Sequence, residues 1–127
     1  MAGLFQVLWG EAEGTFKTAA VLDGTDGEPL IIPIESGASQ TENISTRPTA
    51  VDWDADGHLD LVVGNFAGSF YLFIGKGGGQ FLPEPRRLMD GRNPLTVEGR
   101  HSDPFVVDWD GDGDVDLLSG SGTGGVY

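Results

Sequence analysis

The sequence has 127 residues, enough for one domain with its own hydrophobic core. The net charge is −13 and the seven lysines and arginines form no cluster, which excludes a nucleic-acid surface built on phosphate contacts. There is no cysteine for a disulfide or thiol chemistry, and no apolar run of about 18 residues to span a membrane.

Abundant glycine and short apolar runs between turns predict an all-β chain, and no segment shows sustained helical periodicity. The expected strands, in chain order, are residues 3–9, 15–21, 47–53, 59–65, 69–75, 80–88, 104–109 and 115–120, with a further one beginning at 124. Residues 30–34 are expected to be extended, 36–43 to form a polar excursion, and 90–101 to cross over. Trp9, Tyr71 and Phe73 lie in strands and are expected in the core.

Two nine-residue segments, 52–60 and 108–116, share the pattern D-x-D-x-D-G-x-x-D. Carboxylates at positions 1, 3, 5 and 9 can converge on one cation, and the glycine at position 6 permits a sharp turn. A backbone carbonyl at position 7 would add one more oxygen. Without a cation, the carboxylates would repel one another across a few ångströms. The pattern therefore predicts two Ca²⁺ sites per chain.

Two kinds of helical calcium loop do not match these segments. An EF-hand requires a bidentate glutamate at position 12 and a helix on each side, and a dockerin-type loop also requires an acid there. Position 12 is Val63 in the first segment and Ser119 in the second. The flanking residues are β-branched and apolar, so we expect each loop to join two strands. A metal-free Asp/Gly-rich hairpin turn is the alternative.

The surroundings of the two loops also repeat. Residues 47–51 and 61–64 match segments 56 residues later, and residues 5–10 match residues 70–75 at an offset of 65. The difference is a nine-residue insertion between Pro33 and Arg47. We therefore divide the chain into a first repeat (2–66), a second repeat (67–122) and the start of a further strand (123–127), all within one unit.

The stretch Pro-x-x-Val-Asp-x-Asp-x-Asp-Gly-x-x-Asp-Leu from Pro104, and the small-residue turn Gly64-Asn65-Phe66-Ala67-Gly68, resemble the FG-GAP or VCBS repeat of integrin-type β-propellers. The resemblance implies four-stranded antiparallel blades, about two per chain, with Ca²⁺ bound between the first and second strands of a blade. The implied ligands are the carboxylates of Asp52, Asp54, Asp56 and Asp60 with the His58 carbonyl, and those of Asp108, Asp110, Asp112 and Asp116 with the Asp114 carbonyl.

Two blades do not close a ring, because propellers usually have four to eight. Aligned to the repeat, the chain begins at a third strand and ends at the start of another. We therefore expect a cyclic homo-oligomer, a trimer or a tetramer, in which strands of neighbouring copies complete a shared blade. The alternative is a piece of a longer parent protein that is unstable by itself.

The expected function is a calcium-stabilised scaffold or interaction module, not an enzyme. Trp53 and Trp109 both stand at loop position 2, and we expect them to pack between blades. The alternative is that they form part of a surface that binds a sugar or a protein partner. A polysaccharide-active enzyme would need a basic residue near an open Ca²⁺, and only Arg47 stands near a loop entry. Residues 1–9 are apolar but lack the cationic region of a signal peptide. Extracellular calcium-binding modules have dissociation constants of about 10⁻⁴–10⁻³ M, so we expect an extracellular or periplasmic parent protein.

Overall fold

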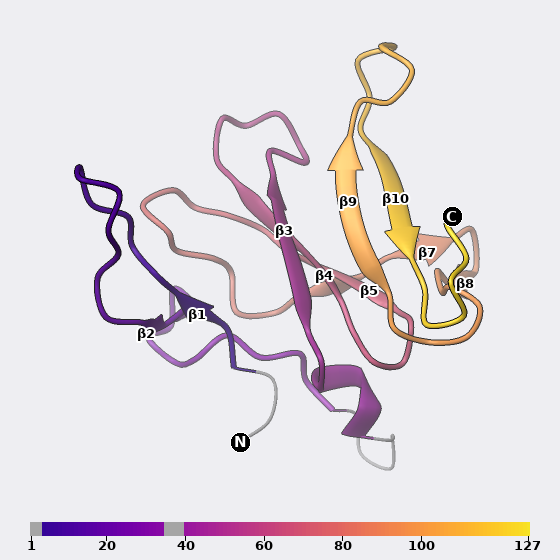
Figure 1. Cartoon of the computed structure of the whole chain (residues 1–127), viewed down its shortest axis with the longest axis horizontal. Helices are drawn as coiled ribbons and strands as arrows, with labels where there is room; N and C mark the ends of the chain where they lie inside the picture. The colour runs from indigo at the N-terminus through magenta and orange to yellow at the C-terminus, as the bar shows by residue number, and fades with distance from the viewer. Residues whose placement is uncertain (1–3, 35–39) are drawn as a thin grey trace.

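The structure, a computed structural model, describes residues 4–34 and 40–127. In these ranges the chain is built of β-strands and one short 3-10 helix, η1 (Gln40–Asn43), which confirms the all-β prediction. The backbone forms three layers side by side: an N-terminal hairpin, a central sheet and a C-terminal strand pair (Figure 1). The expected polar excursion lies partly outside the described residues.

The central sheet is the four-stranded antiparallel unit expected around the first Asp loop. Its strands, in spatial order, are β3 (Arg47–Val51), β4 (Asp60–Gly64), β5 (Phe70–Phe73) and β6 (Arg86–Arg87). β6 is much shorter than the strand expected over residues 80–88. Pro83 and Pro85 precede it, and proline has no N–H to donate to a neighbouring strand.

Three two-stranded antiparallel sheets complete the structure in the described ranges. They are β1 (Gln6–Val7) with β2 (Ala20–Val21), β7 (Met89–Asp90) with β8 (Asn93–Pro94), and β9 (Asp103–Val107) with β10 (Asp116–Gly120). The first pair is shorter than expected. The second is a hairpin inside the stretch that we expected to cross over, and it turns at Gly91-Arg92.

The sequence repeat recurs in the strand pairing. The matching pairs are Arg47↔Gly64 with Asp103↔Gly120, Gly64↔Phe70 with Gly120↔Val126, and Gly10↔Phe16 with Gly75↔Phe81. The first two sets are related by the 56-residue offset and the third by the 65-residue offset. Corresponding residues therefore occupy corresponding places in the backbone.

The two faces of the central sheet bury two separate apolar clusters. Alternation along β4 directs Leu61 and Val63 into one cluster and Val62 into the other. Cluster 1 faces the N-terminal hairpin and consists of Phe5, Leu30, Ile32, Leu61, Val63, Tyr71, Phe73 and Phe81. Cluster 2 consists of Val62, Leu72 and Ile74, with Val51, Trp53, Leu88, Val106 and Leu117 packed against it. The C-terminal pair β9–β10 thus covers the opposite face from the hairpin.

The prediction that three aromatic strand residues lie in the core is correct for Tyr71 and Phe73, which are buried. It is wrong for Trp9, which is 45% exposed. Trp9 lies just beyond the short strand β1, where the hairpin has no further strand at its side to cover the indole.

Candidate metal centre

Both Asp-rich segments form loops at the same end of the molecule. Residues 52–59 connect β3 to β4 and residues 108–115 connect β9 to β10, so each loop joins two antiparallel strands as expected (Figure 1). The helix η1 lies at the opposite end of the sheet. The strand pairs therefore hold the two ends of each loop at a fixed separation.

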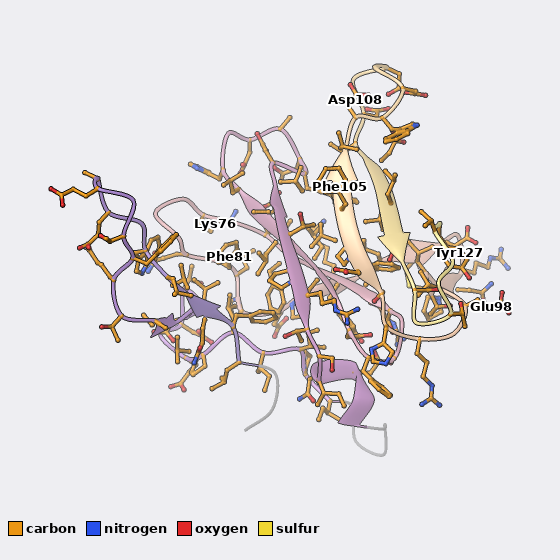
Figure 2. All side chains as sticks on the ribbon, viewed as in Figure 1. Lys76, Phe81, Glu98, Phe105, Asp108 and Tyr127 are labelled. Atoms are coloured by element: carbon orange, nitrogen blue, oxygen red, sulfur yellow. The ribbon has the colours of Figure 1, made fainter. Side chains whose placement is uncertain are left out.

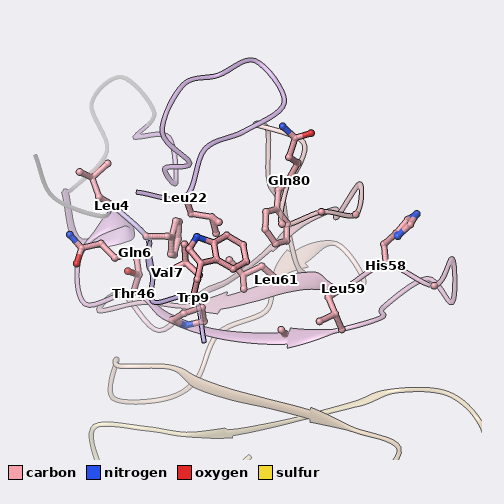
Figure 3. A pocket seen from close by; sticks show the side chains of 18 residues that line it. Leu4, Gln6, Val7, Trp9, Leu22, Thr46, His58, Leu59, Leu61 and Gln80 are labelled. Atoms are coloured by element: carbon pink, nitrogen blue, oxygen red, sulfur yellow. The ribbon is translucent and has the colours of Figure 1, made fainter. Parts of the chain in front are cut away.

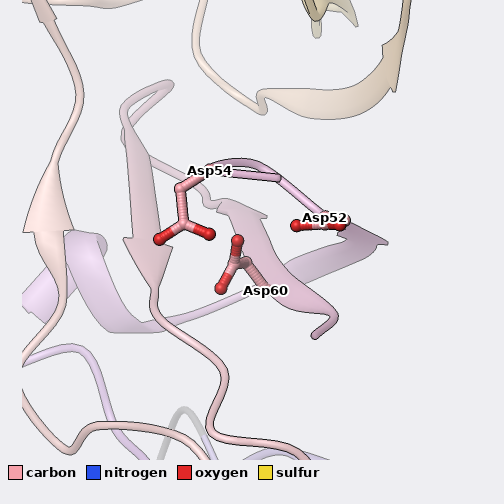
Figure 4. A group of neighbouring side chains, drawn as sticks. All are labelled: Asp52, Asp54 and Asp60. Carbon is pink, nitrogen blue, oxygen red and sulfur yellow. The ribbon is translucent and has the colours of Figure 1, made fainter. Parts of the chain in front are cut away.

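Each loop brings three carboxylates together. Oxygens of Asp52, Asp54 and Asp60 all lie within 4.8 Å of one another (Figure 4). Ca²⁺ binds oxygen at 2.3–2.6 Å, so ligands on opposite sides of the ion are about 5 Å apart. The arrangement could therefore hold a metal ion of the size of Ca²⁺.

The second loop repeats this arrangement. Oxygens of Asp108, Asp110 and Asp116 again lie within 4.8 Å of one another. All are hard, anionic oxygen donors, which suit Ca²⁺ and not the softer metals that take thiolate or imidazole.

The first carboxylate also shapes the loop. Asp52 accepts hydrogen bonds from the N–H of Asp56 at 3.1 Å and of Gly57 at 3.0 Å. This curl needs a left-handed residue at position 6, where Gly57 has φ of +87°. Asp108 accepts equivalent bonds from the N–H groups of Asp112 and Gly113.

The fourth predicted carboxylate of each loop lies outside the converging group. Oδ1 of Asp56 accepts the N–H of His58 at 2.9 Å, and Oδ1 of Asp112 accepts the N–H of Asp114 at the same distance. These bonds turn the backbone at position 7, where we expected a carbonyl ligand. Three of the four carboxylates converge, and the fourth acts on the loop backbone.

Position 9 differs between the loops. Asp60 is fully buried, and it accepts the N–H of Trp53 at 2.8 Å and of Gly75 at 2.6 Å. Among the described residues Asp116 accepts only the equivalent bond, from Trp109 at 2.8 Å, and it is not buried. Asp60 therefore also joins the first loop to the end of β5.

Sequence reasoning missed the role of Gly75. Its N–H reaches Asp60 from 15 residues away, and a Cβ at this position would overlap the backbone carbonyl of Leu59. The sequence signal is a glycine directly after the apolar run of residues 70–74, but that signal reads equally well as an ordinary turn residue.

Comparison with known proteins gives one match. The profile of the FG-GAP-like repeat matches residues 52–119, from the first aspartate of the first loop nearly to the end of β10. This region covers more than half of the chain and contains both Asp loops. No curated protein and no solved structure matches the sequence.

Proposed function

The chain belongs to the FG-GAP-like repeat family, and from this premise we propose that it is a calcium-binding β-propeller module that acts as a scaffold and assembles into a closed ring of identical copies. The observation that carries the proposal is the convergence of three carboxylates in each loop. The proposed role is structural and not catalytic.

Calcium would contribute stability that the chain lacks by itself. An ion that binds only the folded state stabilises it by about 2.7 kcal/mol per site at a hundredfold excess over Kd. It would also cancel the repulsion within each carboxylate group, where the charges lie within 4.8 Å of one another. If these sites bind as weakly as those of extracellular modules, at about 10⁻⁴–10⁻³ M, an extracellular or periplasmic location would keep them occupied.

A calorimetric titration tests the metal assignment. We expect two Ca²⁺ per chain in the native protein and one in each of Asp54→Ala and Asp110→Ala. Asp90→Ala, which removes an exposed carboxylate of β7, should leave both sites intact. The absence of binding heat, together with a Tm that chelator does not change, would contradict the proposal.

Ring assembly is supported by the layered structure. One four-stranded sheet lies between two incomplete strand pairs, and four-stranded antiparallel sheets that pack face to face are the units of propellers. A contact between different surfaces of identical copies closes into a ring when the rotation fits. Three copies would supply six blades and four copies eight.

A second candidate function is sugar binding. Trp109, the second residue of the second Asp loop, is 71% exposed, and an exposed indole next to acidic groups can stack on a sugar ring. Binding to a glycan array that Trp109→Ala abolishes would favour this function. A catalytic role has less support, because Arg47 pairs with Gly64 at the far end of β3 from the loop.

No helix in the described ranges is long and apolar enough to cross a membrane.

A further inference from the structure

A large apolar cavity lies between the N-terminal hairpin and the central sheet. Its volume is about 650 Å³. Figure 3 shows Val7, Trp9 and Leu61 along it, with His58 at one end. Leu59, which also lines it, is 61% exposed although it is an apolar residue. A hollow of this size leaves apolar surface in contact with water, which costs free energy.

The internal repeat shows what the cavity resembles. Cluster 2, on the other face of the central sheet, has Leu72 of β5 and Ile74 just after that strand, with Val106 and Leu117 of β9–β10 packed against it. The counterparts of these four residues at the two repeat offsets are Val7, Trp9, Ala50 and Leu61. All four counterparts line the cavity. The cavity is therefore a second version of cluster 2.

Four members of cluster 2 have no counterpart around the cavity. One is Leu88, whose counterpart 65 residues earlier is Asp23. The other three are Val51 of β3, Trp53 of the first Asp loop and Val62 of β4. Shifted by 56 residues, they correspond to Val107, Trp109 and Leu118 of the same chain. These residues lie on or beside β9–β10, and Trp109 is 71% exposed where Trp53 is half-buried.

We propose that the cavity receives this face of β9–β10 from a second copy of the chain. The proposal rests on the assembly proposed above and names its contact. Val107, Trp109 and Leu118, together with Phe105, form what we term the docking face. In the complex they would occupy the places that Val51, Trp53, Val62 and Thr49 occupy inside one chain.

Side-chain sizes support a second copy as the occupant. Phe105 of β9 is 58% exposed, and its counterpart in β3 is the smaller Thr49 (Figure 2). In the wall of the cavity the difference is reversed: Ala50 lines the cavity, and its counterpart in cluster 2 is the larger Val106. The docking face thus carries a larger side chain and the cavity wall a smaller one, so that the two can pack closely.

Cross-linking tests the contact, because the native chain has no cysteine. In an Ala50→Cys/Val107→Cys variant, a short bis-maleimide should join neighbouring copies into covalent multimers that end at three or four chains. The matched pair Val51→Cys/Val106→Cys occupies the corresponding positions within one chain and should give an internal cross-link. Ala50→Cys/Asp90→Cys moves one thiol to β7, outside the docking face, and should give no multimers.

A variant without engineered thiols provides an independent measurement. Trp109→Ala should weaken self-association by about 30-fold or more, as expected for a truncated tryptophan at the centre of an interface. Because Trp109 is exposed in the single chain, its loss should leave the monomer folded.

The possible failures separate this contact from the proposed function. If the native chain assembles and binds calcium but the 50/107 pair gives no multimers, the docking contact is wrong and the function stands. If the native chain binds two Ca²⁺ yet is monomeric at every concentration, both the docking contact and the ring are wrong, and only the metal assignment stands.

Discussion

At the scale of single residues, the two Asp loops have the same backbone path but unequal strain. Position 4 is left-handed in both, with φ of +59° at Ala55 and +77° at Gly111. This conformation costs a residue with a Cβ about 1–2 kcal/mol, whereas glycine adopts it freely. The first loop therefore carries strain that the second lacks.

An exchange of these residue types should change stability in opposite directions. We expect Ala55→Gly to stabilise the chain by about 0.5–1 kcal/mol, since relief of strain exceeds the added freedom of the unfolded chain. Gly111→Ala should destabilise it by about 1–2 kcal/mol, although no atom lies within 4 Å of the new Cβ. Urea denaturation of both variants measures the difference, and a shift of the same sign in both would contradict the explanation.

Replacement of the aspartate at position 9 should destabilise both loops, but the destabilisation should depend on calcium more strongly in the second loop than in the first. Asp60→Ala leaves the N–H groups of Trp53 and Gly75 without their acceptor, which costs about 3 kcal/mol in calcium and in chelator alike. Asp116→Ala removes one such bond at a more exposed site, so most of its cost should disappear in chelator. Thermal unfolding in both buffers checks this. Equal calcium dependence in the two variants would show that Asp60 has no structural role beyond the metal.

The sequence was sufficient to place the two loops between strands and to predict that aspartates of each loop converge. It could not show that Asp56 lies apart from the other three aspartates of its loop, because all four have identical side chains. In the structure Oδ1 of Asp56 accepts the N–H of His58, and this carboxylate is not among the three that converge. Burial of Asp60 depends on Gly75, whose position only the folded sheet defines.

At the scale of elements, hydrogen bonds to one carboxylate, that of Glu42, connect η1 to the central sheet. Glu42 accepts hydrogen bonds from Asn65 Nδ2, Ser69 Oγ and Tyr71 Oη at 2.8–3.1 Å. Nη2 of Arg87 also donates to it, at 3.3 Å. Its side chain is only 19% exposed, so these donors have little access to water when Glu42 is removed.

Loss of this carboxylate should therefore be costly. We expect Glu42→Ala to destabilise the chain by about 3 kcal/mol, since several partly buried donors lose their acceptor together. Glu98→Ala removes an exposed glutamate and should stay within about 0.5 kcal/mol of the native protein. Denaturant midpoints measure both changes, and a native-like midpoint for Glu42→Ala would show that η1 contributes no stability.

The central sheet could be predicted because its strands alternate or are apolar throughout and are bounded by turn residues. The hairpin β7–β8 could not, since its strands have two residues each and carry no hydrophobic pattern. The Asp90-Gly91 dipeptide was the available signal, and it marks a turn without fixing what the turn connects. The strands expected over residues 3–9 and 15–21 were too long, and for the first of them Trp9 lines the cavity instead of continuing β1.

At the scale of the whole molecule, the described residues form one four-stranded sheet with a two-stranded sheet on either side of it, β1–β2 and β9–β10, besides the small hairpin β7–β8. The wrong prediction for Trp9 belongs to this scale, because its indole lines the cavity between the N-terminal hairpin and the central sheet. Strand patterns identified Trp9 as apolar but could not indicate what would cover its indole, which under the proposed assembly is a second copy of the chain. The exposure of Trp109 has the same explanation under the proposed assembly.

The absolute mass by light scattering on a sizing column, in calcium and then in chelator, tests the central claim most directly. Calcium-ordered loops and complementary faces predict three or four times the 13.4 kDa of one chain in calcium. They also predict loss of this species in chelator. A monomer in both buffers would contradict the claim that copies of this chain complete one another.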